Sequence, residues 1–418
     1  MADCIEVLDK ICGSGKTTEL FKWMNEQPNE RWMYITPLLS EIDVRMPREV
    51  PDLEFFTPQS WYYNKDDKMT KSEHLLLLLN RGVNVAFTHA LFRMLSKDHI
   101  EAVRKNGYNL VIDEECSLIE SASNEFTKGD IDHLLKTGCI EIQKDNLGMV
   151  VWKDSDVTPD GDWKYKEMKV LADLQMLYCA KRDHGMITVH LPITMVSCAK
   201  RVILSSYLFD GSSMSAFVQM KGMAVVPFTD VSVDDAGKKW ALQKLIEIVR
   251  PRNEKVLDEI GLSHTQSKAL SEKNLELLQK AMYSVAYNNK AKATDIMWTS
   301  RKDIAFHEKG FPKLKAKGMP VEECFVSCNA RATNDYAHKW MLLHLYDRHP
   351  HQALKAYLED YGFPIDRDRY ALAELIQWVF RSRIRKGEPI KLAIFSKRMR
   401  TIFMNWLYNE EQCNVRQQ

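Results

Sequence analysis

Apolar residues gather into short runs that alternate with longer segments of helical periodicity. Five of these runs are interpreted as buried strands: 5–8, 32–37, 83–88, 110–112 and 202–206. Strands that are apolar at almost every position and are separated by helices are typical of a parallel sheet covered on both faces. The pattern therefore predicts an α/β fold with parallel sheets.

The alternation is interrupted once and then begins again. Residues 120–190 are richer in Asp, Gly and Lys, and we interpret them as an insertion, a hairpin with a helix, in the first domain. A proline and a polar stretch indicate an interdomain linker at 226–240. A second strand–helix alternation starts at Ile296, and the length of 418 residues fits two or three domains. We therefore predict a first domain over 1–225 and a second over 241–418.

Composition narrows the class of protein. The formal net charge is +1, so any nucleic-acid binding would depend on local basic patches. Nine cysteines without a Cys-x-x-Cys pair favour reduced thiols in the cytosol, and Cys324 and Cys328 are interpreted as buried thiols. The N-terminus lacks a basic region followed by an apolar one, and the apolar run 75–79 is too short to span a bilayer. We expect a soluble cytoplasmic protein without a membrane partner.

The first candidate site lies between the first strand and the first helix. The chain there reads Gly13-Ser14-Gly15-Lys16-Thr17-Thr18. In this context the glycines let backbone N–H groups surround phosphates, and the helix N-terminus adds partial positive charge. Lys16 can then reach the β and γ phosphates, and the Thr17 hydroxyl can ligate Mg²⁺. Lys10 stands where the general pattern has its first glycine.

Two carboxylates follow the fourth apolar strand. Asp113 and Glu114 end the run at 110–112, at the edge of an open α/β sheet where ligands bind. We predict that Asp113 holds Mg²⁺ and that Glu114 orients and deprotonates an attacking water. Together with the phosphate loop, this pair indicates hydrolysis of a nucleoside triphosphate rather than binding alone.

At this point the chain resembles the superfamily 2 helicases, whose fold has two RecA-like domains with the nucleotide site in the cleft between them. Asp113-Glu114-Glu115-Cys116 is similar to the DEAD/DEAH box of that family. The resemblance implies nucleic-acid contacts at Thr36, Thr88 and His89. Ser205-Ser206-Tyr207 stands where the family has Ser-Ala-Thr, which is a partial match.

The resemblance continues in the second half of the chain. Ser300 and Arg301 follow a strand as the fourth family motif does, which implies that they contact nucleic acid. Residues 330–334 are similar to the family's Ala-Arg-Gly-x-Asp. In that segment Thr333 is expected to contact nucleic acid and Asn334 to contact the nucleotide ribose.

A basic segment near the C-terminus is similar to the family motif Q-x-x-G-R-x-x-R. Gln377, Arg381 and Arg385 are spaced i, i+4 and i+8, so a continuous helix would present them on one face. The resemblance implies catalytic roles for all three, with Arg381 as an arginine finger. Arg383 and Arg385 are both candidates for the second arginine, and the shared face favours Arg385. The further basic residues up to Arg400 either follow a phosphate backbone or form a solvated face.

The leading hypothesis is an ATP-dependent DNA helicase or translocase that acts with Mg²⁺ on single-stranded or forked DNA, with RNA less favoured. The chain looks most like helicases encoded by bacteriophages, which implies a role in phage DNA replication or recombination in the host cytoplasm. The alternatives are a DNA-packaging or loader-type ATPase without unwinding activity, and an RNA helicase. The insertion at 120–190 is a candidate binding module for replication proteins.

Overall fold

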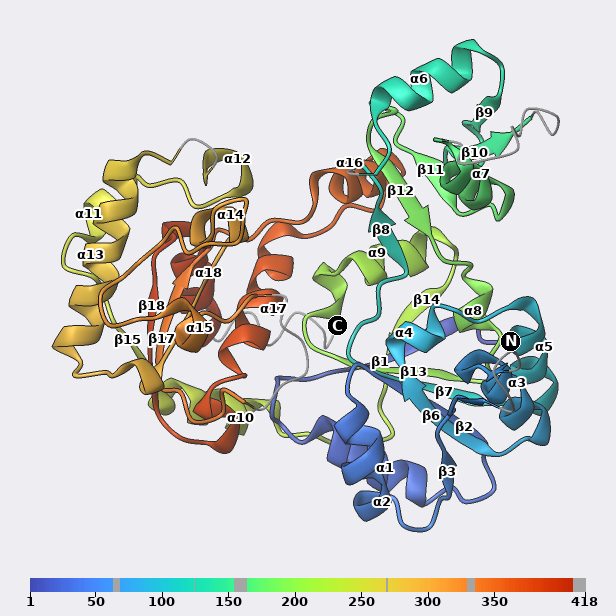
Figure 1. Cartoon of the computed structure of the whole chain (residues 1–418). Coiled ribbons are helices and arrows are strands. Elements are labelled where there is room, and N and C mark those ends of the chain that lie inside the picture. Colours follow the sequence, from blue (N-terminus) through green and yellow to red (C-terminus); the bar gives the residue numbers. More distant parts are fainter. Residues whose placement is uncertain (63–67, 124, 154–163, 268–269, 329–334, 409–418) are drawn as a thin grey trace. The chain divides into compact units, whose positions relative to one another are not determined.

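The computed structural model of the chain describes residues 1–62, 68–123, 125–153, 164–267, 270–328 and 335–408. The chain forms two compact units, coloured along the sequence in Figure 1. Unit 1 comprises Met1–Asp9, Lys16–Ser232 and Pro350–Asp366, and unit 2 comprises the remaining segments. Each unit contains a parallel sheet, which confirms the predicted α/β class.

The central sheet of unit 1 has seven strands, all paired in parallel. In spatial order the strands are β14 (Ala224–Pro227), β1 (Cys4–Asp9), β13 (Val202–Ser206), β7 (Asn109–Asp113), β2 (Trp32–Thr36), β6 (Asn84–Thr88) and β3 (Phe55–Phe56). Every residue of β2, β7 and β13 is buried, as expected for strands covered on both faces. The carboxyl ends of β1, β13 and β7 therefore lie next to one another at one edge.

Helices connect these strands and cover the sheet (Figure 1). They are α1 (Lys16–Asn25), the π-helical turn η1 (Glu41–Arg45), α2 (Met46–Glu49), α3 (Lys71–Arg81), α4 (His89–Phe92), α5 (Lys97–Asn106), α8 (Thr194–Ser197), η2 (Phe209–Gly211) and α9 (Ser213–Met220). The leucine-rich helix α3 begins with a capping box between Thr70 and Glu73. It ends at Gly82, whose φ of 72° is a left-handed conformation that glycine adopts without strain.

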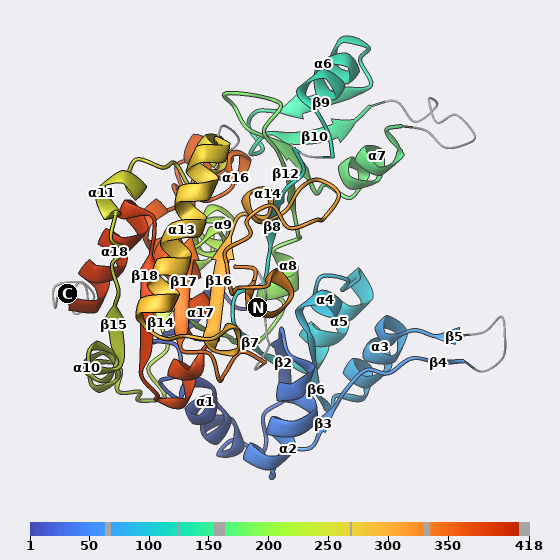
Figure 2. The same cartoon turned by 60° about the vertical axis from the view of Figure 1, so that its left-hand side comes forward.

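The insertion predicted at 120–190 is larger in structure than the hairpin with a helix that the sequence suggested. It forms a five-stranded antiparallel sheet, visible with its two helices in Figure 2. The strands in spatial order are β8 (Ile119–Ser121), β12 (Ile187–His190), β11 (Leu177–Cys179), β10 (Met149–Trp152) and β9 (Ile140–Gln143). With α6 (Lys128–Lys136) and α7 (Lys166–Asp173), the sheet encloses a separate apolar core.

Two short strands between β3 and α3 form a separate antiparallel sheet. Strands β4 (Trp61–Tyr62) and β5 (Lys68–Met69) pair with each other, as Figure 2 shows. The aromatic residue Tyr62 is 67% exposed, and the Lys68 ammonium lies 5.2 Å from the centre of its ring. Tyr62 therefore lies outside the apolar core.

Unit 2 is built on a four-stranded parallel sheet. Its strands in spatial order are β15 (Ile246–Ile248), β18 (Ile390–Ile394), β17 (Met341–Leu345) and β16 (Ile296–Ser300). The helices are α10 (Asp235–Leu245), α11 (Glu254–Leu257), α12 (His264–Ser267), α13 (Glu272–Asn288), η3 (Ala293–Asp295), α14 (Lys302–Ala305), α15 (Val321–Cys324), α17 (Arg367–Val379), η4 (Arg383–Lys386) and α18 (Lys397–Tyr408). The long helix α13 packs Leu278 and Met282 into the main core of the unit.

The unit boundaries differ from the predicted domain boundaries in three ways. The segment Lys10–Gly15 belongs to unit 2, although it lies within the predicted first domain. The change from unit 1 to unit 2 at Ser232 falls inside the predicted linker, but β14 and α10 extend into that linker from both sides. The segment Pro350–Asp366, which contains α16 (Gln352–Asp360), belongs to unit 1 although it lies within the predicted second domain. Among the described residues, no helix has both the length and the apolar character needed to cross a membrane.

Candidate functional site

The phosphate-loop motif forms the turn between β1 and α1. Gly13 and Gly15 have φ values of 69° and 92°, a region that glycine adopts without strain because it has no Cβ. The Ser14 N–H donates to the Ile11 carbonyl at 3.2 Å, which closes the turn. The Ser14 hydroxyl is buried and has no hydrogen-bond partner in the described part of the chain, so it is available to an incoming acceptor.

The side chains at the start of α1 point to the carboxyl edge of the central sheet. The Lys16 ammonium donates to the Ser206 carbonyl at 2.8 Å, at the end of β13. The Thr17 hydroxyl lies 3.4 Å from Asp113 Oδ1, at the end of β7. Lys16 is 190 positions from Ser206 in sequence, and Thr17 is 96 positions from Asp113. The parallel sheet brings these residues together.

Asp113 occupies an electrostatically unfavourable position for a carboxylate. Its residue is 8% exposed, and the Tyr34 hydroxyl donates to Oδ2 at 3.0 Å. Burial, followed by the nearby charges of Glu114 and Glu41, raises the pKa of Asp113 to about 6, while Lys16 acts in the opposite direction. A bound cation would relieve this repulsion, and a carboxylate beside a hydroxyl supplies the oxygen donors that Mg²⁺ prefers. The residues present therefore fit Mg²⁺.

Glu114 differs from its neighbour in both exposure and backbone conformation. Its side chain is exposed, and its φ of 62° is unusual for a residue other than glycine. The Glu114 N–H donates to the Ser205 carbonyl at 3.0 Å, which fixes this turn against the adjacent strand. Strained backbone of this kind occurs preferentially at functional sites. An exposed carboxylate at the sheet edge can accept a proton from a water molecule.

Three further residues at this edge were not predicted as site residues. Asp9 accepts hydrogen bonds from the N–H groups of Leu208 at 2.6 Å and Phe209 at 3.3 Å, and so holds the loop after β13. Glu115 accepts from the Ser206 hydroxyl at 2.9 Å, and Tyr34 binds Asp113. An acidic residue at the end of an apolar strand was a usable signal for Asp9. Nothing in the sequence pattern pairs Tyr34 with Asp113.

The predicted nucleic-acid contacts of unit 1 lie at neighbouring strand ends. Thr36 and Thr88 are register partners at the carboxyl ends of β2 and β6. Thr36 is fully buried, and its hydroxyl accepts from the Leu38 N–H at 3.3 Å, so in this structure it is not accessible to a phosphate. Thr88 is half-buried and precedes α4, and His89 is buried. Their contacts with nucleic acid stay predictions.

In unit 2, the predicted contact residues follow β16. Ser300 is buried and donates to the Arg301 carbonyl at 3.0 Å. Arg301 forms two hydrogen bonds of 2.9 Å with Asp303, and its side chain is 13% exposed. The predicted residues Thr333 and Asn334 lie outside the described residues.

The prediction that Gln377, Arg381 and Arg385 share one helical face is wrong. Helix α17 ends at Val379, because the Ser382 hydroxyl donates to the Val379 carbonyl at 2.7 Å and accepts from the Ile384 N–H. Arg381 therefore lies in a turn, and Arg385 lies exposed in η4.

Within unit 2, Arg381 has carbonyl partners. Its Nη1 donates to the carbonyls of Ser327 and Cys328 at 3.3 and 3.1 Å, and the residue is 9% exposed. Gln377 is half-buried on α17. The guanidinium of Arg381 is thus oriented by the segment that leads into residues 329–334.

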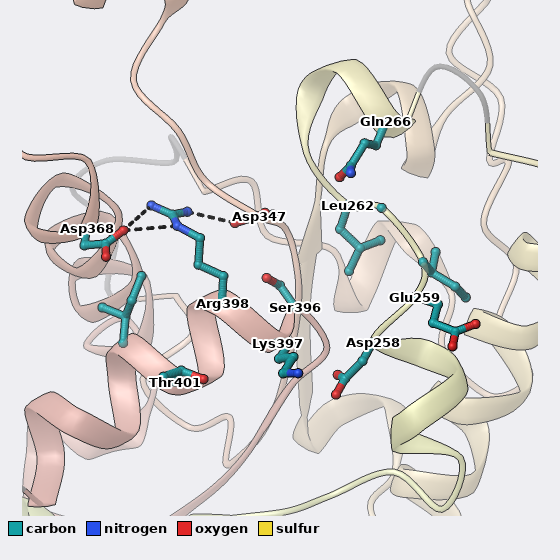
Figure 3. Close-up of a pocket in the computed structure, with 13 residues that line it drawn as sticks. Asp258, Glu259, Leu262, Gln266, Asp347, Asp368, Ser396, Lys397, Arg398 and Thr401 are labelled. Carbon is teal, nitrogen blue, oxygen red and sulfur yellow. Dashed lines mark hydrogen bonds and ion pairs between the residues drawn. The ribbon is translucent and has the colours of Figure 1, made fainter.

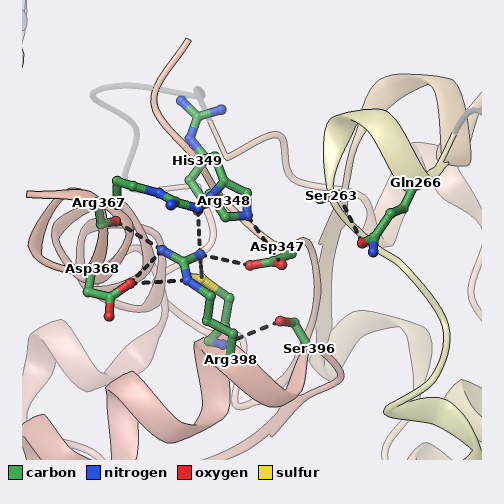
Figure 4. A network of polar contacts seen from close by, with 10 residues as sticks. Ser263, Gln266, Asp347, Arg348, His349, Arg367, Asp368, Ser396 and Arg398 are labelled. Atoms are coloured by element: carbon green, nitrogen blue, oxygen red, sulfur yellow. Dashed lines mark hydrogen bonds and ion pairs between the residues drawn. The ribbon is translucent and has the colours of Figure 1, made fainter. Parts of the chain in front are cut away.

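The basic residues beyond Arg385 do not form a continuous free patch. Arg398 binds Asp368 and Asp347 at 2.8 Å each, and Figure 4 shows this network. Arg400 binds Asp258 at 2.7 Å, and Lys391 binds Glu247 at 3.1 Å. Acidic residues distant in sequence therefore neutralise most of this basic segment.

A cavity of about 460 Å³ adjoins Arg398 at the carboxyl ends of β17 and β18. Figure 3 shows its lining, which includes Leu262, Gln266, Ser396 and Lys397. Carboxylates outnumber cations along the wall, and Arg398 is already paired with two of them. The cavity therefore has no excess positive charge for a phosphate.

Comparisons with known proteins agree with this architecture. A family model described as the YonV C-terminal Rossmann-like domain matches residues 240–407. The SPbeta prophage-derived uncharacterized protein YonV of Bacillus subtilis (strain 168) is 28% identical over 426 residues, which cover 97% of this chain and 99% of that protein.

Two solved structures are similar over almost the whole chain. A structure of XPD in the apo state has a TM-score of 0.51 and 11% identity, covering 97% of this chain and 95% of that one. The structure of S. tokodaii Xpd4 has a TM-score of 0.51 and 12% identity, covering 98% and 95%. At these identities the likeness shows the fold, which is the two-domain fold of XPD helicases.

Proposed function

We propose that this protein is an ATP-dependent DNA helicase or translocase. The observation that carries the proposal is the convergence of Lys16, Thr17 and Asp113 at the carboxyl edge of the central sheet of unit 1. A lysine, a hydroxyl and a buried carboxylate in this arrangement fit a nucleoside triphosphate with its Mg²⁺.

Each residue of the edge has a distinct role in this proposal. The N–H groups of the Gly13–Gly15 turn bind phosphate oxygens, and the Lys16 ammonium exchanges the Ser206 carbonyl for the terminal phosphates. Thr17 and Asp113 hold Mg²⁺, which neutralises charge on the phosphates. Glu114 orients a water molecule and takes its proton. Thr18 and Asn334 contribute nucleotide contacts, and Gln377, Arg381 and Arg385 contribute charge stabilisation.

The nucleic-acid part of the proposal rests on the motif resemblance and on the shared fold. The motif order from Thr36 to Arg385 resembles superfamily 2 helicases, and the fold is that of XPD helicases. Similarity to a prophage-derived protein supports a role in phage DNA replication or recombination, and hence action in the host cytoplasm. Single-stranded or forked DNA is the proposed substrate.

The test is the ATPase rate measured in parallel with single-stranded DNA, duplex DNA and RNA. We expect single-stranded DNA to give the largest stimulation. Lys16→Ala should lower turnover at least about 100-fold, the loss typical of removing one preorganised electrostatic group. Lys22→Ala is the matched control, because Lys22 lies on the same helix, is exposed and pairs only with Glu19 among the described residues. A Lys16→Ala variant with full turnover would contradict the proposal.

A loader or partner-binding ATPase is the second candidate, and one observation favours it. The insertion sheet has its own apolar core, as a separate domain does, and such a domain is a candidate partner-binding module. A strand-displacement assay on forked DNA separates the two functions. Displacement that depends on ATP supports the helicase, whereas hydrolysis without displacement supports a translocase or loader, and selective stimulation by RNA supports an RNA helicase.

A further inference from the structure

The segment between β2 and α2 contains a π-helical turn, η1 (Glu41–Arg45). Such turns are rare and occur frequently at functional sites. The turn begins five residues after Thr36. Leu39, which precedes the turn, is 51% exposed, and Val44, which lies on it, is 67% exposed. Thr36 itself is buried, so a nucleic acid that binds at the carboxyl end of β2 would contact these exposed side chains of the segment 37–45.

Arg45, the last residue of η1, connects three elements. Its Nη1 donates to Glu41 Oε2 at 3.0 Å, and its Nε donates to Glu49 Oε1 of α2 at 3.0 Å. Its Nη2 donates to the hydroxyl of Thr18 on α1 at 2.7 Å. The guanidinium lies 5.4 Å from the centre of the Phe21 ring, and the side chain is 23% exposed. Arginine suits this position because its planar fork binds several acceptors at fixed angles.

Thr18 follows Lys16 and Thr17 on the first turn of α1. A displacement of η1 that moves Arg45 must therefore pull on the helix turn that carries the phosphate-binding lysine. Without Thr18, the two ion pairs of Arg45 would be ordinary i, i+4 pairs of little energetic weight. The contact with Thr18 gives the network a role beyond local helix stability.

We infer that Arg45 is a positioning residue that couples nucleic-acid binding at the segment after β2 to nucleotide binding at α1. This inference rests on the proposed function, because it assumes that a nucleotide binds at the start of α1 and a nucleic acid at the segment after β2. By thermodynamic linkage, a nucleotide that shifts α1 changes the affinity for DNA by the same factor as DNA changes the affinity for the nucleotide.

The coupling is measured as a ratio of DNA affinities. Binding of fluorescent oligo-dT is titrated with and without the nonhydrolysable analogue adenylyl imidodiphosphate and Mg²⁺. We expect the analogue to change the affinity of the wild type by at least about fivefold, within the usual range of allosteric coupling. In Arg45→Met the factor should fall close to one, while the affinity for the analogue alone stays within about threefold of the wild type.

Matched variants separate the coupling from general damage. Arg48→Met is the control, because the Arg48 side chain is 74% exposed and pairs only with Glu49 among the described residues. Thr18→Val removes the acceptor of Arg45 while conserving volume, and it should reproduce the loss of coupling even if Arg45→Met fails to fold. Because Thr18 is itself a proposed nucleotide contact, the coupling of this variant is measured at a concentration of the analogue that saturates it. Thr18→Ser keeps the hydroxyl and should keep the coupling. The double variant Arg45→Met with Thr18→Val should lose no more than either single variant.

The outcomes distinguish this inference from the proposed function. Wild-type coupling in Arg45→Met or in Thr18→Val would overturn the inference, as would an equal loss in Arg48→Met. A wild-type protein that hydrolyses no ATP or binds no DNA would instead refute the proposed function before any variant is made. Loss in Arg45→Met and Thr18→Val with retention in Arg48→Met and Thr18→Ser supports the inference.

Discussion

Two buried titratable side chains, Asp113 in unit 1 and His344 in unit 2, show how similar burial has different consequences. Asp113 lies among Glu114, Glu41 and Lys16, so its carboxylate is placed where a cation would be stabilised. His344, on β17, is 1% exposed and lies beside Cys328 and the Trp378 ring. Its surroundings offer no buried anion among these contacts, so the imidazole is stable only when neutral.

Because His344 is buried in its neutral form, we expect unit 2 to lose stability as the pH falls. Burial, and secondarily the charge of Arg348, lowers the pKa of His344 to about 3, while Asp347 acts in the opposite direction. The unfolded chain takes up the proton below about pH 6.5, whereas the folded chain does not until about pH 3. The stabilisation is therefore complete above pH 6.5 and declines as the pH falls, by up to about 1.4 kcal/mol per unit.

His344→Leu should remove this part of the pH dependence. We expect urea unfolding between pH 7.5 and 4.5 to show a shallower slope in the variant than in the wild type. His307→Leu is the matched control, because His307 is an exposed histidine of the same unit. An unchanged slope in His344→Leu, or an equal change in both variants, would contradict a lowered pKa of His344 in the folded protein.

At the scale of elements, the strands buried on both faces were predictable from the sequence. The strands of the insertion and the end of α17 were not. β2, β6, β7 and β13 appear in the sequence as apolar runs because packing on both faces leaves few polar positions inside them. The insertion strands have only three or four residues, and several are half-buried. Such strands are too short to show the alternation of apolar and polar residues by which a strand is recognised in a sequence. Residues 377–385 have helical spacing, but the hydrogen bonds of Ser382 end α17.

The same distinction applies to the candidate site. Lys16, Thr17 and Asp113 were predicted because each lies at a strand or helix end with a local motif. Tyr34 and Arg45 were not, because their partners Asp113 and Thr18 are distant in sequence and become neighbours only through the order of the sheet. Spacing alone contains no information on such contacts.

We expect Ser382 to stabilise the turn that contains Arg381. Its hydroxyl is fully buried, donates to the Val379 carbonyl and accepts from the Ile384 N–H. Ser382→Ala leaves both backbone groups without this partner and should lower the free energy of unfolding by about 1–3 kcal/mol. Chemical denaturation measures the loss. Ser284→Ala, on the half-buried face of α13, is the control, and equal stability of the two variants would contradict the prediction.

At the scale of the whole molecule, unit 1 is assembled from segments that are distant in the chain. Helix α16 comes between β17 and α17 in sequence, yet it packs against β8, β12 and α9. The Tyr357 hydroxyl donates to the Leu147 carbonyl at 2.7 Å, and its ring lies 4.9 Å from the His190 ring. Arg182 binds Asp360 through its Nε and its backbone N–H. The segment Pro350–Asp366 is thus part of unit 1, although its neighbours in sequence belong to unit 2.

Because α16 packs within unit 1, substitution of Tyr357 should destabilise unit 1. Tyr357→Ala removes a fully buried aromatic side chain, which typically costs about 3–5 kcal/mol. The loss should appear in unit 1, although the residue lies between two elements of unit 2 in sequence. Hydrogen exchange followed by mass spectrometry locates it: protection should fall in β8, β12 and α9 and persist in β16, β17 and β18.

Tyr287→Ala is the matched control, because Tyr287 is a 69% exposed tyrosine on α13 and its removal leaves no cavity. Tyr357→Phe should have an intermediate effect of about 1 kcal/mol, since it loses only the hydrogen bond to Leu147. If exchange in Tyr357→Ala instead increases in β16–β18, α16 belongs energetically to unit 2. The order Ala, Phe, wild type in unit 1 alone would establish that a segment of the second half of the chain stabilises the insertion.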